Sequence, residues 1–136
     1  MSYAALADLV ARFGETELGQ VADTDGSGEI DAALIDRALS DADAEIEAAL
    51  VGRYALPMTP VPDLLTRVAS DLARESLYTD APPDVVSGRA KRARELLAQI
   101  AAGKMRLDAT PAAPEESAAG LVEIVSGRRT SPFTGS

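Results

Sequence analysis

Acidic and hydroxyl side chains recur at alternate positions in the stretch DTDGSGEID, residues 23 to 31. Asp23, Asp25, Ser27 and Asp31 occupy the first, third, fifth and ninth places of this stretch, and Gly28 occupies the sixth. Oxygen ligands at these places, with a glycine that allows a sharp turn, are the arrangement by which a twelve-residue loop between two helices binds calcium. The chemistry that this stretch offers is therefore coordination of a divalent cation.

The last ligand of such an EF-hand loop is missing. The twelfth position, where a bidentate glutamate normally closes the site, is Leu34, so any calcium site here would be weak. The alternative is structural: the carboxylates accept hydrogen bonds from the loop's own backbone, the glycines supply positive φ, and an acidic residue caps the next helix. We favour this turn-and-cap interpretation and predict no cofactor, with weak calcium binding as the alternative function.

The chain contains no histidine and no cysteine. This composition excludes thiolate nucleophiles and the usual zinc ligands, and it removes the commonest general base near neutral pH. Most carboxylates fall on the polar faces of expected helices, so no acid–base pair or nucleophile stands out. We predict that the protein is not an enzyme.

Apolar residues recur at helical spacing in most of the chain. A helix capped by Ser2 is expected to run to Phe13, and one or two helical turns, weakened by Gly19, are expected between residues 15 and 23. A long helix is expected over residues 30–54, and two more within residues 62–80 and 82–104, separated by proline-containing connections. The predicted fold is all-α, a small bundle of four to five helices.

The helical pattern ends after Gly103. Residues 104–120 contain two prolines and several alanines without an apolar stripe, which is typical of an extended connector, and LVEIVSG alternates as one short β-strand would. We therefore predict a helical domain over residues 1–103 and an extended C-terminal arm over residues 104–136. A lone strand in such an arm is suited to pairing with another protein.

Charge is distributed unevenly along the chain. Residues 1–50 hold 12 acidic and 2 basic side chains, a net of −10, whereas residues 51–136 hold 10 acidic and 11 basic ones, a net of +1. Affinity for DNA comes largely from Lys and Arg, so the acidic part should repel nucleic acid. No apolar run approaches the ~20 residues of a membrane helix, and we expect a soluble, unexported protein without membrane contact.

Several segments together resemble a known family. They are VADTDGSGEIDAALIDRALSDADAEIEAALVGRYALPM, PDLLTRVASDLARESLY, RAKRARELLAQIAAGKMRL and a terminal VSGRRTSPF. Over nearly its whole length, the chain resembles the small virion proteins of Mu-like phages and prophages. That family is classified as a domain of unknown function. The most specific feature is the acidic loop followed about twenty residues later by GRYALPM. That family is similar to the head–tail connector proteins of tailed phages, also called adaptor or head-completion proteins.

The resemblance implies a structural virion protein. Connector proteins of this class form a homo-oligomeric ring beneath the portal protein, commonly twelvefold, and dock on the portal and on neighbouring subunits by an extended C-terminal arm. A tail-completion or tail-terminator protein lies below, and DNA passes through the ring without specific binding. The expected location is the virion neck, and the host cytoplasm before assembly.

Three sets of residues are candidates for these contacts. The arm offers apolar anchors, two arginines for acidic groups and a phenylalanine for a pocket: Leu121, Val122, Ile124, Val125, Arg128, Arg129 and Phe133. An inter-subunit basic face is predicted on the last helix from Arg89, Lys91, Arg92 and Arg94. An acidic channel or subunit face is predicted on the long helix from Asp36, Asp41, Asp43, Glu45 and Glu47. For the acidic set and for the two arginines of the arm the alternative is ordinary solvated surface. For the basic face the alternative is a nucleic-acid patch, which the absence of interleaved aromatic residues makes weak.

Overall fold

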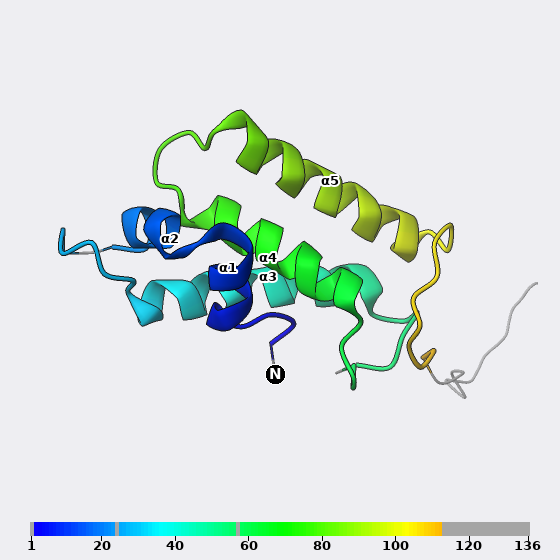
Figure 1. Cartoon of the computed structure of the whole chain (residues 1–136). Coiled ribbons are helices and arrows are strands. Elements are labelled where there is room, and N and C mark those ends of the chain that lie inside the picture. The colour runs from blue at the N-terminus through cyan, green and yellow to red at the C-terminus, as the bar shows by residue number, and fades with distance from the viewer. Residues whose placement is uncertain (1, 24, 57, 113–136) are drawn as a thin grey trace, which may run out of the picture.

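The computed structural model describes residues 2–23, 25–56 and 58–112 (Figure 1). In this part of the chain there are five helices: α1 (Leu6–Phe13), α2 (Glu15–Val21), α3 (Ala32–Leu50), α4 (Asp63–Leu77) and α5 (Asp84–Ala101). They form a small bundle, which confirms the predicted all-α fold. None of the described helices is long and apolar enough to cross a membrane.

Helix α4 lies at the centre of the bundle. Helices α3 and α5 run in one direction and α4 in the other, and α1 crosses against α3 and α4 (Figure 1). The spacing of apolar residues predicts a buried face of Leu64, Leu65, Val68, Leu72 and Leu77. All of these are buried except Leu64, which is partly buried, and two alanines between them let the neighbouring helices approach closely. The buried residues are Leu65, Val68, Ala69, Ser70, Leu72, Ala73 and Leu77. The Ser70 hydroxyl is satisfied, because it donates to the carbonyl of Thr66 at 2.7 Å.

Helices α3 and α5 bury one face each. In α5 the buried face is the predicted one: Val86, Ala90, Ala93, Leu97 and Ile100. In α3 the spacing of apolar residues predicts a face of Ile30, Leu34, Ala38, Ala42, Ile46, Ala49 and Leu50. The observed buried face is rotated slightly from it and consists of Ile35, Ala38, Leu39, Ala42, Ile46 and Leu50. Helix α3 is also shorter than predicted at both ends. Asp31 caps its start, and after Leu50 the chain turns through Gly52, whose φ is 90°.

The expected start of the first helix at Ser2 is wrong. Helix α1 begins at Leu6, and Asp8 accepts a hydrogen bond from the backbone N–H of Ala5 at 2.8 Å. Tyr3 precedes the helix and is buried, with only 4% of its surface exposed. Its N–H donates to Asp43 (2.9 Å) and its hydroxyl to Glu47 (3.3 Å), both on α3. Burial and the neighbouring Glu47 carboxylate raise the pKa of Tyr3 to about 12.

Residues 104–112 lie against the bundle. Met105, Leu107 and Ala109 pack on the core, and the N–H of Leu107 donates to the hydroxyl of Tyr54 at 2.8 Å. Ala55 N–H donates to the carbonyl of Thr110 (2.9 Å), and Ala112 N–H donates to that of Arg53 (3.0 Å). This short antiparallel pairing of residues 53–55 with residues 110–112 is called the arm root below. The predicted strand within residues 121–127 lies outside the described residues.

Helix α2 is joined to α4 by a carboxylate–guanidinium pair. Arg74 donates from Nε (2.7 Å) and Nη2 (2.8 Å) to the two carboxylate oxygens of Glu17, and the hydroxyl of Tyr78 donates to Glu17 at 3.0 Å. The Arg74 guanidinium also lies 4.2 Å from the centre of the Phe13 ring. The hydrogen bonds from Arg74 hold the pKa of Glu17 below its ordinary value, although partial burial opposes them.

Gly19 is where α2 meets the acidic loop. A Cβ atom at Gly19 would lie 2.5 Å from the carbonyl oxygen of Gly28, so Gly19→Ala should lower the free energy of unfolding by about 1–3 kcal/mol. Gly88 is the matched control, because it is exposed on α5 and a Cβ added there would meet open space. Gly88→Ala should raise that free energy by about 0.5–1 kcal/mol. Urea unfolding measures both, and equal stabilisation by the two substitutions would contradict the close approach.

Glu17→Gln should lower the free energy of unfolding at pH 7 by about 1–3 kcal/mol, because it replaces a bidentate charged acceptor. The folded-state pKa of Glu17 is depressed, so the carboxylate contributes fully above its unfolded pKa of about 4.3. This contribution is lost as the pH falls through the lower folded value. The difference between wild type and variant should therefore shrink in acid, as measured by urea unfolding across pH.

Glu15→Gln is the control for this comparison, since Glu15 is an exposed carboxylate on the same short helix. Its effect on the free energy of unfolding should stay within about 0.5 kcal/mol. A Glu17→Gln effect that is the same at neutral and strongly acidic pH would show that the charge of Glu17 contributes nothing.

Candidate functional site

The acidic loop between α2 and α3 is organised around the carboxylate of Asp23. One oxygen of this carboxylate accepts from the N–H groups of Asp25 (3.2 Å) and Gly26 (3.0 Å), and the other accepts from Gly28 (2.8 Å). Gly26 and Gly28 have φ values of 76° and 81°, which glycine adopts without strain. Both oxygens of Asp23 therefore accept hydrogen bonds from the loop's own backbone.

The remaining predicted ligands of the loop are also turn and cap acceptors. Asp25 accepts from the N–H of Ser27 (3.0 Å), and the Ser27 hydroxyl accepts from Glu29 (3.2 Å). Hydrogen bonds with Ser27 hold the pKa of Asp25 below its ordinary value. Asp31 accepts from the N–H of Ala33 at 2.9 Å and caps α3.

The described residues contain no cluster of three or more acidic side chains placed to hold a metal ion. The loop has the geometry of the turn-and-cap interpretation, in which its carboxylates bond to backbone N–H groups. Calcium binding by Asp23, Asp25, Ser27 and Asp31 stays a prediction.

The predicted acidic set on α3 does not form one free face. Asp43 and Glu47 accept hydrogen bonds from Tyr3. Asp36 and Asp41 are exposed, and neither is hydrogen-bonded or ion-paired to another described residue. These two carboxylates are the part of the predicted acidic set that is available for a channel surface or for a partner.

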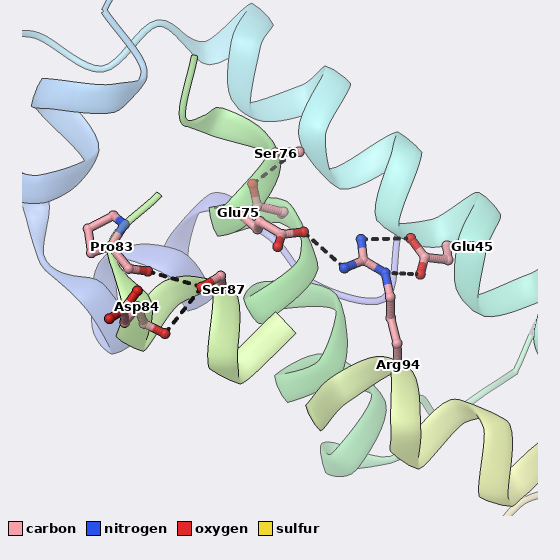
Figure 2. Close-up of polar contacts among 8 residues, drawn as sticks. Glu45, Glu75, Ser76, Pro83, Asp84, Ser87 and Arg94 are labelled. Atoms are coloured by element: carbon pink, nitrogen blue, oxygen red, sulfur yellow. Dashed lines mark hydrogen bonds and ion pairs between the residues drawn. The ribbon is translucent and has the colours of Figure 1, made fainter. Parts of the chain in front are cut away.

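Glu45 pairs with Arg94 inside the same chain. The guanidinium of Arg94 reaches from α5 to Glu45 on α3 at 2.7 Å and to Glu75 on α4 at 3.0 Å, so three helices meet at one side chain (Figure 2). The two carboxylates raise the pKa of Arg94. The side chains of Arg94 and Glu45 are 47% and 39% exposed, and such exposed pairs contribute little free energy to folding. Within this chain, Arg94 and Glu45 satisfy each other, which removes both from the set of free charges.

The other three residues of the predicted basic face are exposed on α5. Arg89 and Arg92 line a groove of about 260 Å³ between α4 and α5, together with Arg67 from α4. Val68, Ala93 and Leu96 form its apolar lining, and Asp71 is the acidic residue within it. Burial raises the pKa of the Asp71 carboxyl above its ordinary value, while Arg89, Arg12, Arg74 and Arg67 oppose that shift. Lys91 does not line this groove.

Sequence reasoning missed Arg67 and Asp71 as members of this groove. Their spacing of four residues places them on one face of α4. This spacing is the feature of the sequence that could have indicated that they act together. The pattern could not reveal which face of α5 lies beside them, and that packing is what gathers three arginines.

A second hollow of about 530 Å³ lies beside the arm root. It is lined by one segment before α4 and one after α5: Ala55, Met58, Thr59, Pro60, Asp108, Ala109 and Thr110. The predicted arm anchors Leu121, Val122, Ile124, Val125, Arg128, Arg129 and Phe133 lie outside the described residues, so their contacts stay predictions.

Comparison with known proteins assigns the chain to a phage family. Residues 3–126 match the family described as Bacteriophage Mu, Gp36. Gene product J of Escherichia phage Mu is 33% identical over 105 residues, which are 76% of this chain and 74% of that protein. The Mu-like prophage FluMu protein gp36 of Haemophilus influenzae (strain ATCC 51907 / DSM 11121 / KW20 / Rd) is 30% identical over 105 residues, 77% of this chain and 74% of that protein. The resemblance to Mu-like phage proteins is confirmed, and the chain belongs to the Bacteriophage Mu, Gp36 family.

Proposed function

We propose that this protein is a structural virion protein, a head–tail adaptor that forms a ring beneath the portal and docks through its C-terminal arm. The family relationship supports a role in phage particles, because the matched proteins come from phage Mu and from a Mu-like prophage. The proposed partners are further copies of the chain, the portal protein and a tail-completion or tail-terminator protein. The proposed place of action is the virion neck.

The arm root is the observation that carries this proposal. Residues 110–112 pair through backbone hydrogen bonds with residues 53–55, so the last described residues run alongside the bundle as one strand of a short antiparallel pair. The 530 Å³ hollow lies beside this pairing. A segment that is already extended at its base is suited to adding a strand to a neighbouring protein, with alternate side chains entering pockets.

The bundle has properties that suit an adaptor subunit. Three long helices pack on one another, and the Arg74–Glu17 pair joins the short helix α2 to them. Such a body can hold a fixed shape while the arm makes the contacts. The net charge of −9 and the exposed Asp36 and Asp41 favour a surface that DNA passes without binding, because like charge denies the phosphates a site. We propose no catalytic activity.

The arm residues provide the test. The paired substitutions Val122→Asp and Ile124→Asp, made in the full chain, should weaken binding to the portal protein of the same phage at least tenfold. The reason is that charged groups would replace two apolar anchors of the arm. Binding is measured by sedimentation or mass photometry of purified portal rings mixed with the chain.

The matched control is Val51→Asp with Val85→Asp, which makes the same change at two exposed apolar residues outside the arm and should leave portal binding unchanged. Thermal unfolding of each variant verifies that the bundle is intact. Portal binding that survives the arm substitutions would remove the docking role from the arm. A wild-type chain that does not bind the portal would refute the adaptor function itself.

A further inference from the structure

The groove between α4 and α5 gathers three arginines around a single carboxylate. It is defined by Arg67, Arg89, Arg92 and Asp71 and is called the arginine groove below. None of the three arginines is in an ion pair or hydrogen bond with another described residue. Arg74 and Arg94, on the same two helices, each have a carboxylate partner. A cluster of guanidinium groups with apolar lining and one competing carboxylate is suited to binding further anionic groups.

The arginine groove is better suited to binding a carboxylate than a nucleic-acid phosphate. Phosphate-backbone binding requires an extended basic surface, and the net charge of this chain is −9. Asp71 in the arginine groove adds a further negative charge, and no aromatic side chain of the described residues lines the groove for base stacking. A short acidic segment of a protein has the size and charge for this groove and avoids the repulsion that a whole nucleic-acid strand would meet.

The chain itself carries a suitable acidic segment. The loop of residues 23–31 projects beyond the ends of α2 and α3, at the left edge of the molecule in Figure 1. Asp25 and Glu29 are exposed on this loop, whereas Asp43 and Glu47 on α3 accept hydrogen bonds from Tyr3, and Glu45 is paired with Arg94. The net of −10 in residues 1–50 complements the basic groove that α4 and α5 form.

We propose that the arginine groove of one copy binds the acidic loop of a second copy, through Asp25 and Glu29. The two surfaces are different parts of one chain, so the contact is head-to-tail, the kind that closes into a ring. This inference rests on the proposed ring and supplies its subunit contact. It assigns Arg67, Arg89 and Arg92 to carboxylate binding and gives the acidic loop a function other than metal coordination.

A charge exchange between two full-length variants tests the pairing. The groove variant carries Arg89→Glu and Arg92→Glu, and the loop variant carries Asp25→Lys and Glu29→Lys. Assembly is measured by mass photometry on portal rings, as the number of copies bound and their cooperativity. Each variant alone should lose cooperative assembly at least tenfold, because like charges face each other. An equimolar mixture should restore it, since every contact then joins opposite charges.

Two controls separate this pairing from simpler effects. Arg12→Glu with Arg37→Glu changes the same amount of exposed charge outside the arginine groove and should assemble as wild type does. Glu29→Lys alone leaves the hydrogen bonds of Asp23 and Asp25 in place and should weaken assembly in the same direction as the double substitution. This single substitution tests the pairing even if the double loop variant does not fold.

The outcomes distinguish the pairing from the adaptor function. If wild type forms rings and the groove variant does so equally well, or if the mixture does not recover assembly, the pairing is overturned and the adaptor function stands. If single copies bind the portal without cooperativity, the pairing is likewise overturned. If wild type binds neither portal nor itself, both proposals fail. If wild type binds a DNA fragment and the groove variant does not, the ligand of the groove is phosphate and not carboxylate.

Discussion

Helix α4 has to be covered on three sides, and the rest of the fold follows from that requirement. Seven of its fifteen residues are buried, which exceeds the single stripe of a surface helix. Helices α3 and α5 pack on two sides, and α1 closes part of the third. The chain has only five aromatic residues, so the core is filled by Leu, Ile, Val and Ala, and alanines such as Ala69 and Ala73 allow close helix approach.

This packing also divides the charged residues into two groups. Some are brought within hydrogen-bond distance inside the chain: Glu17 with Arg74, and Arg94 with Glu45 and Glu75. These pairs join helices that the apolar core already holds, and their value is in orientation more than in free energy. Others are exposed and make no ion pair within the described part of the chain, most clearly the arginines of the groove between α4 and α5. A charged group without an internal partner costs nothing while it is solvated and is available to another molecule.

Sequence periodicity was sufficient to predict the helices, but it could not predict which residues of other elements lie beside them. The buried faces of α4 and α5 follow directly from the spacing of Leu and Val, because that spacing depends only on local helix geometry. The predicted start of α1 was wrong because Tyr3 is held outside the helix by Asp43 and Glu47, forty or more residues away. For the same reason the basic face was predicted only from α5. Arg94 turned out to be paired with α3, and Arg67 on α4 joined Arg89 and Arg92, neither of which a single-helix pattern can show.

The acidic loop illustrates how one pattern can satisfy two different requirements. Alternating Asp and Ser side chains with intervening glycines suit a calcium loop, and they equally suit a tight turn whose N–H groups need acceptors. Replacement of the closing glutamate by Leu34 weakens the first use, while the contacts of Asp23 with three N–H groups fulfil the second. Gly19 then fixes the loop against α2, because any larger residue would meet the carbonyl of Gly28. A loop held from within by one carboxylate can expose its other carboxylates in a fixed arrangement, which is what binding to a second surface requires.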